Sequence, residues 1–115
     1  MGEDIRSINK VRRASKIDGN QAKVVQYLRG LGMTVQPLSA VGQGVPDLLV
    51  GFRGMNFLVE VKDGDQFPSH RVLTKMQQEW HAMWSGSVVV ANSAEEAATK
   101  IARMSLAGTI LESMR

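Results

Sequence analysis

The stretch that most constrains the fold runs from Gly44 to Lys62, where a short turn joins two apolar segments. Residues 48–52 and 56–61 are rich in Val, Leu and Phe, and the connection between them contains Gly54. Short apolar runs joined by a glycine-containing connection are typical of a β-hairpin. The sequence therefore predicts two paired strands in the middle of the chain.

The second of these strands carries two charged side chains on an otherwise apolar segment. Because side chains alternate between the faces of a strand, Glu60 and Lys62 share one face with Leu58, and the other face is apolar. We expect such a strand to be covered on both sides, where charges cost free energy unless they are paired or bind a metal ion. Asp47 opens the first strand, so its carboxylate can converge with Glu60. We predict a functional site here.

Upstream of the hairpin, the pattern predicts a helix at about residues 19–31 and a short strand at residues 33–38. Asp18 followed three residues later by Gln21 is typical of a capping box. Pro37 favours an edge position or a strand end. The buried stripe of the helix is predicted from residues at helical spacing: Ala22, Val25, Leu28 and Leu31.

Downstream of the hairpin, we predict a helix over residues 73–84, a strand over 87–91 and a helix that starts after Ser93. Thr74 is a candidate N-cap for the first helix, and Ser93 with Glu96 is a capping box for the second. The expected order is α-β-β-β-α-β-α, an α/β fold with a mixed sheet flanked by helices. The stripe of the first helix is most simply core, although it could instead form a dimer contact: Met76, Trp80 and Trp84.

Length and composition limit the class of protein. A chain of 115 residues, 43% hydrophobic and 22% charged, suits one globular domain, which we place at residues 18–104.

A basic arm at residues 1–17 is either solvated or in contact with phosphates, and residues 105–115 form a tail that could be a short helix on this domain or on a partner. We expect no membrane segment, because no apolar run approaches the roughly 20 residues needed. The absence of cysteine fits a cytoplasmic protein, and the net charge of +3 permits nucleic-acid binding.

Carboxylates from two neighbouring strands point to metal-assisted chemistry. Two carboxylate oxygens and a backbone carbonyl suit Mg²⁺ or Mn²⁺, which prefer oxygen ligands and retain several waters. Such an ion polarises a phosphoryl oxygen and lowers the pKa of bound water, while a neighbouring lysine stabilises developing charge. These groups together predict a phosphodiester hydrolase.

Three motifs in order resemble the virus-type replication-repair nuclease (VRR-Nuc) domain of the PD-(D/E)XK superfamily, in particular its small standalone phage members. They lie at residues 44–51, 60–64 and 73–81, and the resemblance covers about residues 18–100. It implies a restriction-endonuclease-like fold and a Mg²⁺-dependent endodeoxyribonuclease, for which Mn²⁺ is a substitute. It further implies a homodimer that acts on branched DNA such as Holliday junctions, in the cytoplasm of a bacterium or a phage-infected host.

The resemblance also assigns roles to individual residues. It makes Asp47 and Glu60 the metal ligands, with the backbone carbonyl of Val61 completing the set. It makes Lys62 the catalytic lysine and Gln77 the helix residue that reaches into the site. Arginine and lysine side chains around this region are candidate DNA contacts: Arg12, Arg13, Arg53, Arg71 and Lys75.

One position departs from the superfamily pattern, which often includes a glutamate on the first helix. Gln21 stands in that region and is an accessory candidate that could hold a metal-bound water, but it serves equally well as a capping residue. The number of metal ions therefore stays open. Neither His70 nor His81 is expected to be catalytic.

Two alternatives to a junction-cleaving enzyme remain. One is a non-catalytic module that retains the nuclease fold and binds branched DNA. The other is a nuclease that acts on linear or flapped DNA.

Overall fold

The structure is a computed structural model that describes residues 20–63 and 72–114. The predictions for the basic arm, which include Arg12 and Arg13, and those for Arg71 and His70 lie outside the described residues. The described elements, in chain order, are a helix at residues 20–30, β1 (Thr34–Pro37), β2 (Leu48–Phe52), β3 (Met55–Val61), α2 (Lys75–Met83), β4 (Val88–Ala91) and α3 (Ala94–Ser113).

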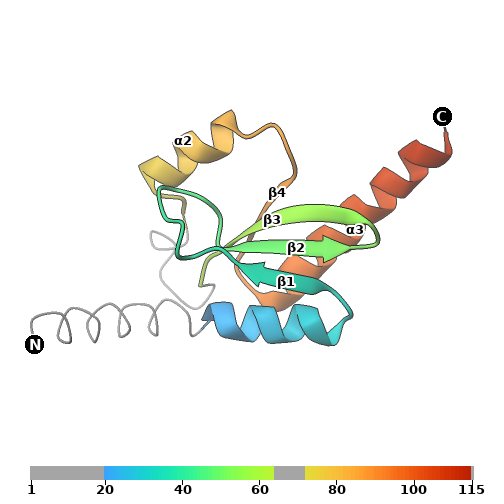
Figure 1. Ribbon diagram of the computed structural model, residues 1–115, viewed down its shortest axis with the longest axis horizontal. Coiled ribbons are helices and arrows are strands. Elements are labelled where there is room, and N and C mark those ends of the chain that lie inside the picture. Colours follow the sequence, from blue (N-terminus) through green and yellow to red (C-terminus); the bar gives the residue numbers. More distant parts are fainter. Residues whose placement is uncertain (1–19, 64–71, 115) are drawn as a thin grey trace, which may run out of the picture.

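The four strands form one mixed sheet in the order β1-β2-β3-β4 (Figure 1). β1, β2 and β3 pair antiparallel, and β3 pairs with β4 in parallel. A parallel pair requires a crossover connection, and the segment that contains α2 provides it. The predicted hairpin, the mixed sheet and the interior position of β3 are confirmed.

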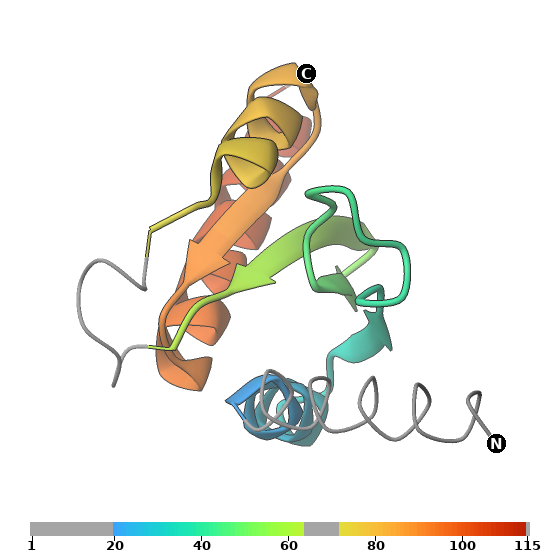
Figure 2. The ribbon, with the colours of Figure 1, turned by 90° about the vertical axis from the view of Figure 1, so that its left-hand side faces the viewer.

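One face of the sheet is covered by two helices. Helix 20–30 and α3 pack on this face and contribute to a single hydrophobic cluster with the sheet, and α3 runs alongside β4 in both views (Figures 1 and 2). Alternate positions of the strands supply the other half of the cluster. The fully buried members are Val24, Leu28, Leu48, Val50, Val59, Ala91, Ala97 and Ile101.

The buried stripe of helix 20–30 differs from the predicted one. Ala22 and Leu31 are exposed, whereas Val24 is fully buried. The stripe begins at Gln21, a polar residue, and continues three, four and seven positions later, which is ordinary helical spacing. The prediction was wrong at two positions because a buried glutamine hid the start of the pattern.

The helix α2 lies on the opposite side of the sheet from helix 20–30 (Figure 1). Its N-cap is Thr74, as predicted, in a capping box with Gln77. None of its nine residues is buried, and Met76 is 57% exposed. The prediction that the Met76, Trp80 and Trp84 stripe forms core is wrong, because α2 covers only part of that face.

Residues 105–113, for which a separate short helix was an option, continue α3 beyond the sheet (Figure 1). Ser105 is its last buried residue. In the described part of the chain, neither α3 nor any other helix combines the length and the apolar character needed to cross a membrane.

Candidate active site

Two carboxylates meet where β2 begins and β3 ends. Leu48 pairs with Val59, so the next step of the antiparallel register places Asp47 opposite Glu60, on the same face. The Oδ2 atom of Asp47 accepts a hydrogen bond from the Val61 backbone amide at 2.7 Å. This bond fixes the Asp47 side chain across the hairpin.

A polar network joins β3 to α2 on this face. The Gln77 Nε2 atom donates to Glu60 Oε1 at 2.6 Å, and the Lys62 Nζ atom donates to Gln77 Oε1 at 2.7 Å. Lys62 Nζ also lies 3.6 Å from Glu60 Oε1, as an ion pair with the lysine 12% exposed. The structure thus brings together four predicted site residues, Asp47 among them.

The cap of α2 sets the orientation of the Gln77 amide. Gln77 Oε1 accepts a hydrogen bond from the Thr74 backbone amide at 2.9 Å, while the Gln77 backbone amide donates to Thr74 Oγ1. Because Oε1 faces two donors, the amide nitrogen must face Glu60. The helix cap and the site therefore share one side chain.

Glu60 occupies an unfavourable position for a charge. Its side chain is 2% exposed, and Oε2 has no hydrogen-bond partner among the described residues. Burial, followed by the neighbouring charge of Asp47, raises the pKa of Glu60 to about 7, although Lys62 opposes the shift. A cation between the two carboxylates would relieve both effects.

The donor set fits a hard divalent cation. Amides of β3 alternate in direction, with Leu58 and Lys62 donating toward β4 and Val61 toward Asp47. A strand residue directs its amide and carbonyl to the same side, so the Val61 carbonyl faces the side of Asp47. In the described ranges, no group of three or more His, Cys, Asp or Glu side chains could hold a metal ion. Two carboxylates, a carbonyl and water are nevertheless an acceptable set for Mg²⁺.

A search of solved structures supplies the family. It finds a protein described as a VRR_NUC domain, with a TM-score of 0.53 and 31% sequence identity. The match covers 71% of this chain and 89% of that one. This chain belongs to the VRR-Nuc family. A scan against protein-family models and a search of curated proteins both find no match.

The VRR-Nuc domain also contains supporting contacts that the sequence did not predict. The Asn20 side chain donates to the Lys62 carbonyl at 3.0 Å and so ties helix 20–30 to the end of β3. Gln21 donates to Ser39 Oγ at 2.9 Å, and its own Oε1 is buried without a partner among the described residues. No local sequence pattern signals the Asn20 contact, because its partner lies on a distant strand end.

His81 lies closer to this VRR-Nuc site than its sequence position suggested. Burial, and then the positive charge of Lys62, lower the pKa of His81 below its usual value. Its Nε2 atom is buried and has no partner among the described residues. His81 follows Gln77 by one helical turn, a spacing that could have signalled a shared face.

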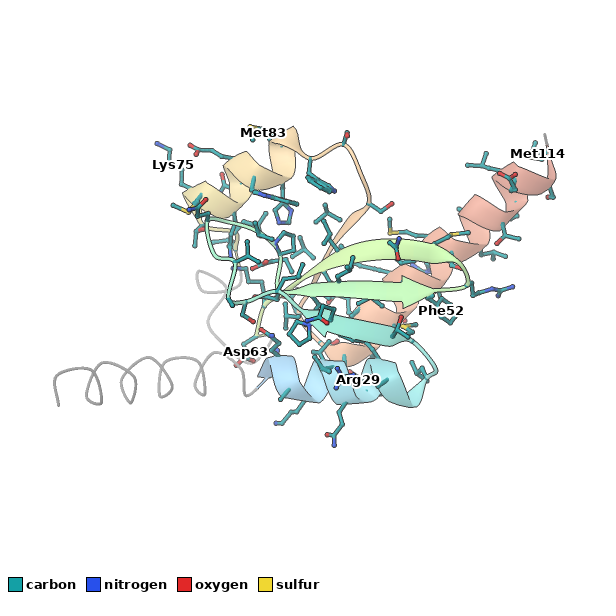
Figure 3. All side chains as sticks on the ribbon, viewed as in Figure 1. Arg29, Phe52, Asp63, Lys75, Met83 and Met114 are labelled. Atoms are coloured by element: carbon teal, nitrogen blue, oxygen red, sulfur yellow. The ribbon has the colours of Figure 1, made fainter. Side chains whose placement is uncertain are left out.

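The two described candidates for DNA contacts lie apart from the carboxylates. Arg53 follows Phe52 in the turn between β2 and β3, at the opposite end of the hairpin from Asp47. Lys75 is the first residue of α2, and its side chain points away from the sheet (Figure 3). The structure does not bring either one into the polar network.

Proposed function

We propose that this VRR-Nuc domain is a Mg²⁺-dependent DNA endonuclease that hydrolyses phosphodiester bonds, with Mn²⁺ as a substitute, and that it acts as a homodimer on branched DNA such as Holliday junctions. The observation that carries the proposal is the network in which Glu60, Lys62 and Gln77 contact one another beside Asp47. A family fold alone does not establish an activity, whereas this combination of groups suits one class of reaction.

Asp47, Glu60 and the Val61 carbonyl would hold the ion, which neutralises phosphate charge and makes water a better nucleophile. Asp47 is already fixed by the Val61 amide, so little ordering remains for binding. Glu60 must lose its proton to become a ligand, and its raised pKa places that step near neutral pH.

Lys62 would stabilise the charge of the transition state, and Gln77 would position Lys62 for this role. Gln77 accepts a hydrogen bond from Lys62 and donates one to Glu60, so it holds the ammonium group beside the carboxylate. A cation fixed at that point stabilises negative charge that develops on the phosphoryl group in the transition state.

Paired incisions at a junction require two active sites, and one chain supplies one. A homodimer with two-fold symmetry meets this requirement. A strict monomer, both in solution and on DNA, would contradict junction resolution and would favour cleavage of linear or flapped DNA.

A second candidate function is a binding module without catalysis, and Gln21 is the observation that favours it. Its amide is bonded to Ser39 and adds no negative charge to the ligand set. This candidate predicts salt-sensitive binding to branched DNA, unaffected by EDTA, without cleavage in Mg²⁺ or Mn²⁺.

The deciding experiment is cleavage of an end-labelled four-way junction beside a matched linear duplex, in Mg²⁺, Mn²⁺ or EDTA. We expect paired cuts on the junction with either metal, and a loss of about 10²–10³-fold in Lys62→Ala. Lys100→Ala is the matched control, because it removes the same charge from α3, where Lys100 pairs with Glu96. Equal cutting of every substrate would leave a general nuclease, and binding without cleavage would support the second candidate.

A further inference from the structure

A mainly apolar hollow lies between α2 and the sheet, on the face that carries the polar network. Its volume is about 560 Å³, within the range of ligand sites. None of the described residues that line it is charged. They are Leu38, Val45, Leu49, Asn56, Phe57, Leu58, Trp80, Trp84, Gly86 and Ser87.

The wall formed by α2 is aromatic. The rings of Trp80 and Trp84 stack with centroids 4.8 Å apart and an angle of 17° between their planes. Trp84 is 49% exposed, so part of its surface remains open. Gly86 supports its edge closely, since a Cβ atom there would lie 2.7 Å from the Trp84 Nε1 atom. These contacts place an indole surface at the hollow.

Two residues that line the hollow, Leu58 and Trp80, are near neighbours of the proposed catalytic groups along β3 and α2. Leu58 precedes Glu60 by two residues on the same face of β3, a separation of about 7 Å. On the other wall, Trp80 follows Gln77 by three residues, nearly one turn of α2. A nucleotide whose phosphate lies at Lys62 therefore has its base, or that of its neighbour, within reach of the hollow.

We propose that this hollow binds an unpaired nucleobase of the DNA substrate, stacked on Trp84, next to the phosphate that is cleaved. The inference rests on the proposed function. A base is a flat, uncharged group that stacks on aromatic side chains irrespective of its sequence, whereas a phosphate would require cations that the described lining lacks. Asn56, an exposed residue of the lining, offers an amide that can donate to and accept from the edge of a base.

The site would give the enzyme a way to select DNA structure. Bases within an intact duplex are stacked and paired, so occupying the hollow from a duplex costs unpairing energy. Junctions, flaps and single-stranded ends present bases at lower cost. The hollow therefore favours cleavage near a disrupted base pair.

The first test uses the intrinsic fluorescence of the protein. The chain contains two tryptophans, and both line the hollow, so the whole tryptophan signal reports on it. We would titrate the wild type in EDTA with a hairpin bearing a single-stranded overhang, and with the same hairpin carrying abasic overhang sites. We expect quenching by the first DNA and not by the second, with binding followed separately by anisotropy of labelled DNA. Equal quenching by both, or binding of the first DNA without quenching, would overturn the proposal.

The second test uses variants of one side chain. We expect Trp84→Leu to weaken binding of the overhang DNA by about tenfold to one hundredfold, with Trp84→Phe much closer to the wild type. Met83→Leu is the matched control, because Met83 is 82% exposed and lies outside the lining. Thermal melts establish that each variant is folded, and the wild-type titration does not depend on any variant.

Three further outcomes bear on this inference, and the last two separate it from the proposed function. If Trp84→Leu changes the oligomeric state and leaves DNA affinity per protomer unchanged, the hollow is a surface for a second copy and the inference fails. If the wild type cleaves DNA but neither abasic sites nor Trp84→Leu alters the reaction or the binding, the inference fails and the proposed function stands. If base-dependent quenching occurs without cleavage in any metal, the nuclease proposal fails and the base site stands.

Discussion

The two faces of β3 differ in what covers them and in what holds that cover in place. Phe57 and Val59 face helix 20–30 and α3 in a cluster of buried side chains. Leu58 and Glu60 face α2, a helix without a buried residue in its nine positions. Strand alternation assigns side chains to these faces, but the helices on each side are attached by different forces.

On the first face, attachment is apolar. α3 inserts Ala97 and Ile101 into the cluster, and burial of such side chains contributes roughly 1.5–3 kcal/mol for each large one. On the second face, α2 is held by the polar contacts of Gln77 and by the close approach of Gly44 to Met76. Stability is therefore concentrated on one face, whereas the groups suited to chemistry lie on the other.

Truncation of one apolar residue on each face should give the largest difference between the faces in the free energy of unfolding. Ile101→Ala removes a fully buried side chain and is expected to lower the free energy of unfolding by about 2–5 kcal/mol. Leu49→Ala, on the α2 face, should cost roughly 1 kcal/mol or less, since Leu49 is 36% exposed. Urea denaturation measures both, and equal losses would contradict the division between the faces.

The buried carboxylate should give the α2 face a pH dependence of its own. The pKa of Glu60 rises from 4.5 to about 7 in the folded chain, so the folded state retains a proton that the unfolded state loses across this interval. Stability from this group is present below pH 4.5 and is lost as pH rises to about 7, by about 3 kcal/mol in total.

Glu60→Gln keeps the shape and removes the titration. The difference in unfolding free energy between variant and wild type should therefore grow in favour of the variant from pH 4.5 to pH 8. Added Mg²⁺ at pH 8 should stabilise the wild type and not the variant, because ligand binding to the folded state alone raises stability. A pH-independent difference between the two proteins would refute the assignment.

A substitution at Gly44 tests whether its close contact with Met76 holds α2 on the sheet. Its φ is +83°, and a Cβ atom would lie 2.6 Å from the Met76 carbonyl oxygen. Gly44→Ala should cost about 2 kcal/mol from the backbone conformation alone, with more from the clash, and should reduce cleavage by moving Gln77. Gly42→Ala is the matched control, since Gly42 has a φ of +69° and nothing within 4 Å. If both variants behave alike, the contact with Met76 is unimportant.

The sequence predicted the hairpin, the shared face of Asp47, Glu60 and Lys62, and the order of elements, because strand alternation and helix caps are local rules. The resemblance added the role of Gln77, which stays a prediction, and the family. The structural match shows the family. Local rules state which residues share a face. They do not state whether another element covers that face.

Because local rules do not state which element covers a face, one prediction was wrong and one contact was missed. The Met76, Trp80 and Trp84 stripe has ordinary core spacing, yet α2 has too little beneath it to bury these side chains. The Asn20 contact with the Lys62 carbonyl joins residues 42 positions apart, so no local pattern contains it. Such contacts depend on the packed arrangement of helix and sheet, which periodicity does not supply.

Removal of a helix cap should give the smallest effect of these substitutions. On the α3 face the effect should be a loss of stability, and on the α2 face a loss of cleavage. Thr74 caps α2 and Ser93 caps α3, each by accepting a hydrogen bond from the backbone amide three residues later. Replacing either with alanine removes a bond worth about 1 kcal/mol of helix stability. In Ser93→Ala the loss should appear in urea denaturation with cleavage nearly unchanged, because α3 is anchored by buried side chains.

In Thr74→Ala the loss should appear mainly in cleavage, as a reduction of several-fold. The first turn of α2 carries Gln77, and no residue of this helix is buried, so fraying there displaces the amide from Glu60 and Lys62 without opening the core. Single-turnover cleavage and urea denaturation of the two alanine variants, measured side by side, test this. If Thr74→Ala lowers stability as much as Ser93→Ala and leaves cleavage intact, α2 contributes to the fold and does not position the site.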